Sequence, residues 1–180
     1  MDHDLNVAGA LVVALGDRLR DATEDAAGMS GPLPAALASL REWAGGRTVD
    51  TLAGGLRLSH SRTVRVIDRL EAEGLALRER DPADGRSVLV RLTPAGERAG
   101  EAVLAARAAT LSQALRGLEP GERRAFAELA ERVLAELTTG RRSAGANCRL
   151  CDAGACGHYE GRCPVTRAAD AAEAEASAAR

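Results

Sequence analysis

The sequence is poor in aromatic residues, with one Trp, one Tyr and one Phe in 180 residues. A core with so few aromatic side chains has to be built from Leu, Val and Ala, which favours packed helices over a β-sandwich. The chain also has no lysine, so all 24 of its basic residues are arginine, and its formal net charge is −2. This balance excludes a globally basic nucleic-acid binder, and contact with DNA or RNA requires a local basic patch.

Long apolar runs are absent as well. The run VAGALVVALG at 7–16 is too short to span a bilayer. It follows the acidic MDHD and precedes the charged GDRLRDATED, unlike the core of a signal peptide. We therefore expect a cytoplasmic protein without membrane association, in which structural disulfides are rare.

The residue sets of common enzyme active sites are also missing from the sequence. It contains no recognisable pair of catalytic carboxylates, no Ser/His/Asp set and no phosphate-binding glycine loop. We expect no enzymatic activity.

The hydrophobic pattern predicts a mainly α-helical chain with one small β-hairpin. Apolar residues at three- and four-residue steps predict an amphipathic helix that ends at GMSGP, residues 28–32. Three shorter helices follow in PAALASLREW, VDTLAGGL and HSRTVRVIDRLEAE, the last two capped by Thr48 and Ser59. Alternating side chains predict strands at 75–80 and 87–92, and two further helices are expected at 94–117 and 120–138.

A short helix, a tight turn, a second helix and a hairpin form the winged helix-turn-helix order. In the second helix we expect Val64, Ile67 and Leu70 to face the core. The other side carries hydroxyl, imidazole and guanidinium groups suited to phosphates and guanine. These candidate DNA-binding residues are Ser59, His60, Ser61, Arg62, Arg65 and Arg69. Arginines also occur on ordinary solvent-exposed helices, so their place in the motif, not their presence, indicates DNA binding.

The run TVDTLAGGLRLSHSRTVRVIDRLEAEGLALRERDPADGRSVLVRLTPAGE resembles the MarR family of bacterial transcription regulators. The matching features are a Leu-Ala pair in the first motif helix, a serine-rich start of the recognition helix, a D-x-R wing and an L-T-x-x-G junction. In this chain they fall at Leu52-Ala53, at Ser59 and Ser61, at Asp84 and Arg86, and at residues 92–96. The resemblance extends over residues 5–138.

The resemblance implies a homodimer with interdigitated N- and C-terminal helices and two winged lobes on double-stranded DNA, at a pseudo-palindromic operator, typically as a repressor. It assigns Arg86 as the minor-groove reader and Asp84 as its loop-bracing partner, although a plain turn residue is the alternative for Asp84. Apolar seams on the last two predicted helices independently call for a helical partner. They consist of Leu104, Ala108, Leu111, Leu115, Leu118, Phe126, Leu129, Val133 and Leu137. Many members of the family respond to small aromatic ligands, but no effector is identified by this sequence.

Gly54-Gly55 is a departure from an ordinary helix, because each glycine costs roughly 0.5–1 kcal/mol relative to alanine. The pair either loosens the first motif helix or permits close packing against the recognition helix.

All the cysteines of the chain lie in the glycine-rich stretch CRLCDAGACGHYEGRCP, as Cys148, Cys151, Cys156 and Cys163. Four thiolates can hold an iron-sulfur cluster or zinc, and a reversible thiol redox pair is the third possibility. The C-x2-C-x4-C-x6-C-P spacing contains only one zinc-type knuckle and is similar to the 2Fe–2S loop of SoxR-type regulators. The prediction is a four-cysteine centre that holds an iron-sulfur cluster, of the 2Fe–2S type, with Zn2+ as the alternative. We expect His158 to support the loop and not to replace a cysteine ligand.

The expected organisation has five segments: an N-terminal dimerisation helix (1–30), a winged helix-turn-helix domain (31–93), C-terminal dimerisation helices (94–140), a cysteine-rich metal-binding segment (141–167) and a low-complexity tail (168–180). The expected function is that of a homodimeric DNA-binding regulator whose operator binding is modulated by the cysteine centre. One alternative is a zinc-stabilised regulator that responds to a small molecule. A more remote one is a small iron-sulfur redox protein that does not bind DNA.

Overall fold

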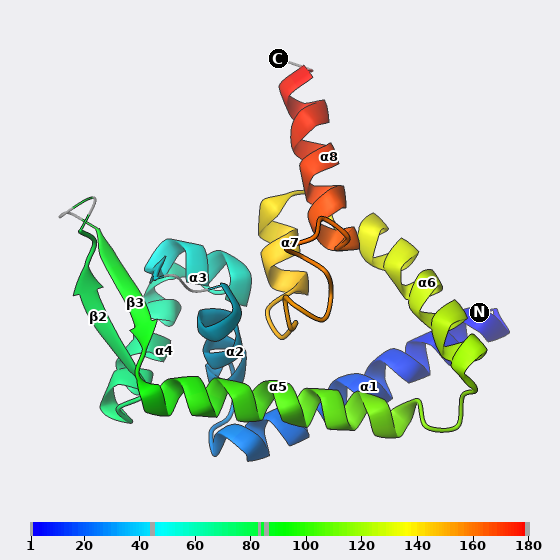
Figure 1. Cartoon of the computed structure of the whole chain (residues 1–180), viewed down its shortest axis with the longest axis horizontal. Helices are drawn as coiled ribbons and strands as arrows, with labels where there is room; N and C mark the ends of the chain where they lie inside the picture. The colour runs from blue at the N-terminus through cyan, green and yellow to red at the C-terminus, as the bar shows by residue number, and fades with distance from the viewer. Residues whose placement is uncertain (1, 44–45, 83, 85–86, 179–180) are drawn as a thin grey trace.

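The computed structural model describes residues 2–43, 46–82, 84 and 87–178. Within these ranges the chain is mainly helical, with a small antiparallel sheet (Figure 1). The elements in chain order are α1 (His3–Ala27), α2 (Leu33–Trp43), β1 (Arg47–Thr48), α3 (Val49–Leu56), α4 (His60–Ala72), β2 (Ala76–Arg80), β3 (Val88–Leu92), α5 (Pro94–Ala114), α6 (Pro120–Glu136), α7 (Arg141–Asn147) and α8 (Pro164–Ala178).

The sheet has the strand order β1-β3-β2 and confirms the predicted hairpin. In the hairpin, Ala76 pairs with Leu92 and Arg80 pairs with Val88. Strand β1 adds a short third strand, with Arg47 opposite Val90. The sequence pattern does not predict β1, because two residues are too few to show an alternation.

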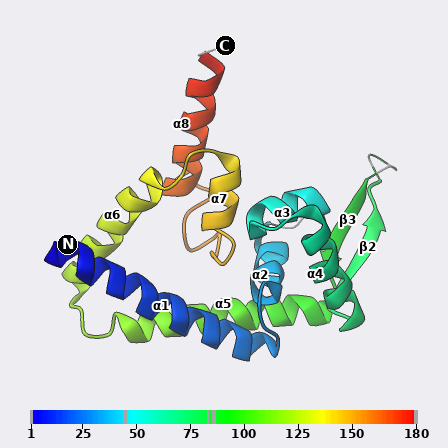
Figure 2. The ribbon, with the colours of Figure 1, turned by 180° about the vertical axis from the view of Figure 1, so that it is seen from behind.

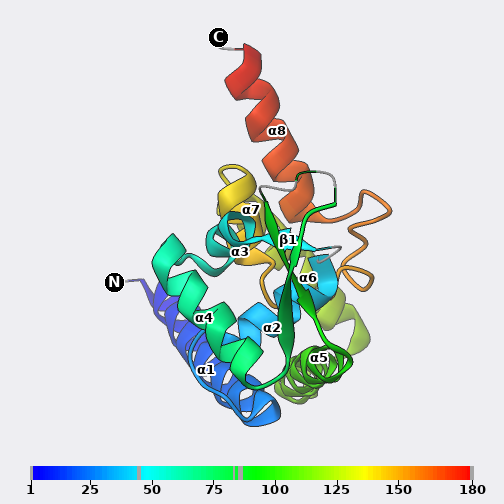
Figure 3. The same cartoon turned by 90° about the vertical axis from the view of Figure 1, so that its left-hand side faces the viewer.

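The core of the winged lobe lies where α2, α3 and α4 pack against the hairpin. Leu37 of α2 and Val90 of β3 are fully buried in it. Helix α4 buries Ile67 and Leu70, as predicted from their spacing. The prediction for Val64 is wrong, because this residue is only half-buried and Thr63 and Val66 occupy the inner face instead. Seen from the wing side, α4 and the hairpin form the outer end of the molecule (Figure 3).

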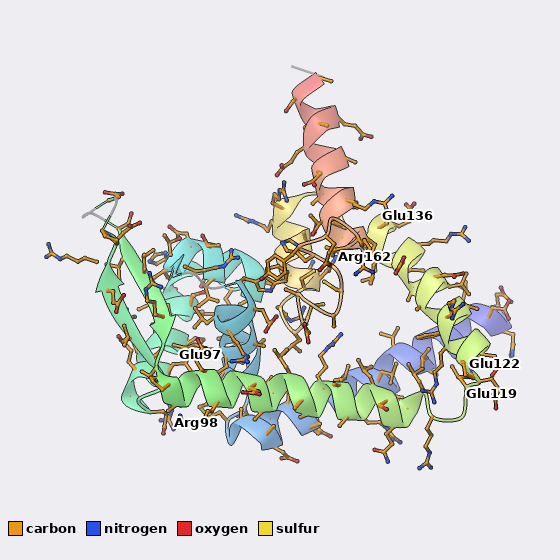
Figure 4. All side chains as sticks on the ribbon, viewed as in Figure 1. Glu97, Arg98, Glu119, Glu122, Glu136 and Arg162 are labelled. Carbon is orange, nitrogen blue, oxygen red and sulfur yellow. The ribbon has the colours of Figure 1, made fainter. Side chains whose placement is uncertain are left out.

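Helices α1 and α5 run side by side away from this lobe, and α6 follows at the far end (Figure 2). A reciprocal capping arrangement fixes the turn into α6: the backbone N–H of Glu119 donates to Glu122 at 2.9 Å (Figure 4). Helix α6 buries none of its residues. We call α1 and α6 the arms of the molecule. On α1 Val12 is 71% exposed, and Leu137, directly after α6, is 61% exposed. None of the described helices is long and apolar enough to cross a membrane.

Helix α8 begins directly after Cys163 and continues through the segment expected to be a low-complexity tail. Ala169 is fully buried, and Arg141 of α7 forms ion pairs with Asp170 at 2.5 Å and Glu173 at 3.0 Å. The expected boundary between 167 and 168 therefore falls inside a helix. The alanine-rich composition of residues 168–178 favours a helix. The ion pairs with Arg141 hold one face of α8 against α7.

Gly96, in the first turn of α5, permits a very close backbone contact with Leu75. A Cβ at this position would lie 1.9 Å from the carbonyl oxygen of Leu75, which accepts a hydrogen bond from the Thr93 N–H at 3.0 Å. We expect Gly96→Ala to lower the free energy of unfolding by about 1–3 kcal/mol, because α5 has to move off the hairpin. Urea unfolding measures this. Gly121→Ala in α6 is the control, since the space around that Cβ is open, and an equal loss in both variants would contradict the contact.

Candidate nucleic-acid interface and cysteine cluster

The start of α4 is set by a tight turn and a side-chain cap. Arg57 ends α3 in the left-handed region, with φ of 56°. Two residues later Ser59 is extended, and its hydroxyl accepts a hydrogen bond from the Arg62 N–H at 3.4 Å. The predicted cap is therefore present, and Ser59 fixes the helix start from which the following side chains project.

The outer face of α4 presents exposed arginines. Ser61, Arg62, Arg65 and Arg69 are all exposed. Arg69 pairs with Glu73 at 2.7 Å. In the part of the chain that the structure describes, Arg62 and Arg65 form no ion pair with an acidic side chain, so both guanidinium groups are available to an anionic partner.

The acidic residues of α4 are balanced from the hairpin. Arg78 of β2 pairs with Asp68 at 2.8 Å and also with Glu71. Because Arg78 pairs with both carboxylates, neither of them forms an ion pair with Arg62 or Arg65. A local basic patch can exist on a chain with a net negative charge because of this pairing.

His60 connects the two helices of the motif. Its Nδ1 atom lies 2.7 Å from Oδ1 of Asp50, in the first turn of α3. Both side chains are largely exposed, at 62% and 82%. The contact couples the start of α4 to α3.

The wing loop is held at Asp84. The Ser87 hydroxyl donates to the Asp84 carboxylate at 2.8 Å, and the Ser87 N–H donates to the Asp84 carbonyl at 2.8 Å. Arg86 lies outside the described residues. The assignment of Arg86 to the minor groove and of Asp84 as its partner stays a prediction.

The four cysteines gather in one small cluster at the junction of α7 and α8. Cys148 caps the end of α7, and Cys163 directly precedes α8. Both are buried, whereas Cys151 and Cys156 are half-buried, and all four are free thiols. Cys148 and Cys163 pack with Val165, and Cys151 and Cys156 pack against them. Cys151 is the main neighbour that acts on Cys148, and Cys163 is the thiol that acts most on Cys156, so we describe the cluster as two pairs.

Within each pair the thiol pKa values are separated. The hydrogen bond from Cys148 lowers the pKa of Cys151 to about 7, while the same bond and burial raise the pKa of Cys148. In the second pair, burial raises the pKa of Cys156 to about 11. Burial also acts to raise the pKa of Cys163, but hydrogen bonds from Thr166, Val165 and Cys156 outweigh it and lower that pKa. Each pair thus contains one thiol with a lowered pKa, and thiolates are the form that soft metals bind.

The four thiols are suitable ligands for a soft metal, but they are not arranged around one point in this structure. Among the described residues, no group of three or more His, Cys, Asp or Glu side chains is arranged to hold a metal ion. Four cysteine sulfurs have the chemistry of a zinc or iron-sulfur site. Binding of such a centre would therefore have to draw the two pairs together.

The cysteine loop is docked on α2 of the winged lobe. The Ser39 hydroxyl donates to the Arg149 carbonyl at 3.0 Å, and Glu42 accepts from the Ala153 N–H at 2.8 Å. The Trp43 ring meets His158 edge-on, with ring centroids 4.7 Å apart. His158 Nδ1 is 2.9 Å from the Thr166 hydroxyl, which agrees with the expectation that it supports the loop.

Of the two uses expected for the glycine pair in α3, close packing is present at Gly55, but with a different partner helix. A Cβ on Gly145 of α7 would lie 3.4 Å from the Cα of Gly55, so the two helix backbones touch. A Cβ on Gly54 would meet nothing within 4 Å. Gly55 therefore permits close packing against α7, not against the recognition helix.

A cavity of about 390 Å³ lies between α3 and the cysteine segment. Its lining includes Trp43, Arg47, Gly55 and Arg142. Burial lowers the pKa of Arg47, and this guanidinium makes no ion pair within the described ranges. A neighbouring hollow is lined by Ser59 and His60 of the turn and by Arg142 and Ser143 of α7.

Arg142 is the residue near the interface that sequence reasoning missed. It is exposed and adjoins the hollow beside the start of α4. Arg142 is about 80 positions from Ser59 and His60 in the sequence. No local sequence pattern could therefore have indicated that it lies near them. Gly55 was the only sequence signal of the α7 contact.

Residues 35–88 match the model of the MarR family. The chain is 40% identical over 63 residues to the uncharacterized HTH-type transcriptional regulator YsmB of Bacillus subtilis, covering 35% of this chain and 43% of the relative. It is 33% identical over 78 residues to YkoM, an uncharacterized HTH-type transcriptional regulator of the same organism, covering 43% of this chain and 51% of that relative. The matches thus span about half the length of these curated relatives. The structure also resembles that of a probable transcriptional regulator from Pseudomonas aeruginosa, with 30% identity, a TM-score of 0.55 and coverage of 70% of this chain and 96% of that one.

Proposed function

Since the chain belongs to the MarR family, we propose that it is a homodimeric transcription regulator, acting as a repressor, that binds double-stranded DNA through α4 and the wing. The single observation that carries the proposal is that Arg62 and Arg65 are exposed, form no ion pair among the described residues, and lie on a helix whose other face is buried. Arginine in this position suits both phosphates and the guanine edge in the major groove. A protein that acts on the chromosome of a bacterial cell works in the cytoplasm.

The exposed arms support the dimer. Large apolar side chains without cover lie on both terminal arms of the chain. They are Leu5, Val7, Leu11, Val12 and Val13 on α1, and Leu129, Val133 and Leu134 on α6, with Leu137 directly after it. A second copy that buries these stripes would place two α4 helices on one duplex, as a pseudo-palindromic operator requires.

We also propose that the cysteine cluster holds a metal or redox centre that modulates operator binding. The support is the packing of four thiols together at one junction and the docking of their loop on the winged lobe. An iron-sulfur cluster is the first candidate and Zn2+ is the alternative. The residues that would hold either are Cys148, Cys151, Cys156 and Cys163.

The visible absorption spectrum of anaerobically purified protein tests the identity of the centre. An iron-sulfur cluster is expected to give a brown protein with bands above about 400 nm, a region in which zinc is silent. A colourless protein with stoichiometric zinc would contradict the cluster and support the alternative. Cys163→Ser is the matched variant, since it removes one ligand and is expected to lose the bands.

The cavity beside α3 favours one second candidate, a zinc-stabilised regulator that responds to a small molecule. A volume of about 390 Å³ is of the size that small-molecule sites have. In that case the spectrum shows no iron-sulfur bands and a ligand changes operator affinity without changing the metal content.

A further inference from the structure

The cysteine segment contacts both the winged lobe and helix α6. We call α7, the cysteine loop and α8, residues 141–178, the cysteine module. Helix α7 packs on α3 of the winged lobe, α8 packs on α6, and α7 and α8 pack on each other (Figures 1 and 2). The module therefore bridges the lobe that carries α4 and the arm that carries the exposed apolar stripe.

The lobe side of the bridge is a close, specific contact. Helices α3 and α7 touch through Gly55 and Gly145, with no side chain between them. The loop is fixed to α2 by the bonds of Ser39 and Glu42 to its backbone. The Tyr159 hydroxyl adds a third bond, to the Glu42 carbonyl at 3.3 Å.

The arm side is fixed where α6 ends. The Asn147 amide donates to the Thr138 hydroxyl at 3.1 Å and to the Leu137 carbonyl at 3.4 Å. Thr138 is buried. The last turn of α7 is thus tied to the end of α6, one residue before the first cysteine.

The sulfur atoms sit at the joint of this bridge. One pair follows α7 directly, at Cys148 and Cys151, and the second pair ends at Cys163, one residue before α8. A centre with four thiolate ligands requires both pairs to turn toward one point. A centre held by Cys148, Cys151, Cys156 and Cys163 would therefore fix the angle between α7 and α8, and with it the position of the lobe relative to α6.

Helix α3 contacts α4 directly, so a change in the position of α3 also moves the start of α4. Asp50 in its first turn bonds His60 at the start of α4, and α3 and α4 pack on each other. Beside the same turn, α7 places Arg142. A docked module thus orders the first helix of the motif and adds positive charge next to the DNA face.

We propose that the cysteine module is a metal-dependent strut, in which a four-thiolate centre locks α7 against α3 and fixes the distance between the two winged lobes of the dimer. This inference rests on the proposed function for its effect on DNA. A fixed lobe spacing lowers the ordering cost of binding two half-sites. The loaded protein therefore binds its operator more tightly than the metal-depleted protein.

The test compares loaded and metal-depleted protein in two measurements. The first is amide hydrogen exchange of residues 49–56, which needs no DNA. The second is the dissociation constant for a duplex selected from a random library by the loaded wild type. We expect faster exchange in α3 after metal removal and a roughly tenfold weaker operator affinity, within the usual range of coupling between sites.

Gly145→Leu is the decisive variant, because a large side chain at this position pushes α7 off α3. We expect it to keep its metal while exchange in α3 and operator affinity no longer respond to metal removal. Gly145→Ala is the matched control: its Cβ makes an ordinary contact at 3.4 Å, and the wild-type response is retained. Where Gly145→Leu fails to fold, Ser39→Ala with Glu42→Gln removes two anchors of the loop and is expected to reduce the response.

Three results would overturn the strut: wild-type protein without bound metal, exchange in α3 that ignores metal removal, or a full response in Gly145→Leu. An exchange response without DNA binding in either state contradicts the proposed function but leaves the strut intact.

Discussion

Replacing Arg62 and Arg65 together with alanine is expected to weaken operator binding by roughly thirtyfold or more. Each well-formed arginine contact to a base or phosphate contributes about 1–3 kcal/mol, and 1.4 kcal/mol is a factor of ten. The two residues are exposed and form no ion pair within the described part of the chain, so the loss falls on binding and not on folding. Fluorescence anisotropy with a selected duplex, repeated at several salt concentrations, measures both affinity and salt dependence.

The salt dependence of binding shows whether the lost contacts were made to phosphates. Each lost phosphate contact is expected to flatten the slope of log K against log salt by about one unit. Arg116→Ala is the matched control, since Arg116 is an exposed arginine far from α4 in the chain, and it should leave affinity and slope unchanged. Unaltered binding in the double variant would remove α4 as the DNA face. A wild type that binds no duplex at all would instead favour the alternative of a redox protein without DNA binding.

The second large effect is expected from Leu129→Glu combined with Val133→Glu. Each of these α6 residues is 58% exposed in the single chain, and we expect both to be buried in the dimer. A carboxylate without a partner in an apolar interface costs several kcal/mol, so the dimer should dissociate. A monomer with one lobe also loses the avidity of two linked half-sites, about 10²–10⁴ in affinity.

Sedimentation or light scattering gives the mass of the variant directly. The single chain has a mass of 18.7 kDa, and the double variant should sediment as this monomer while the wild type sediments as twice that mass. Arg132→Ala, on the same helix and also exposed, is expected to remain dimeric. A wild type that is already monomeric, or a double variant that stays dimeric, would contradict the assignment of the arms.

The winged lobe could be predicted well from the sequence because its signals are local. The caps at Thr48 and Ser59 and the hairpin alternation each depend on neighbouring residues, and each is present. The error at Val64 arose because consecutive residues of α4 border the core, and Thr63 is buried with its hydroxyl bonded to the Ser59 carbonyl at 3.1 Å. A buried threonine of this kind has no hydrophobic signal.

The position of the cysteine module could not be predicted in the same way. The Ser39 hydroxyl donates to the carbonyl of Arg149, 110 positions away, and the Ala153 N–H donates to the carboxylate of Glu42, 111 positions away. No periodic pattern links such distant segments. Cysteine spacing indicated a centre, and the Gly54-Gly55 pair indicated an unusually close helix contact, but the partner of that contact emerges only from the fold.

The most direct test of the central claim, that a two-fold dimer reads DNA through α4, is selection of duplexes from a random library by the purified protein. We expect an enriched inverted repeat with half-site centres about one helical turn apart, roughly 10 base pairs. Enrichment should be lost in the Arg62→Ala, Arg65→Ala variant. Recovery of no enriched sequence, or of a single half-site without its inverted copy, would contradict it.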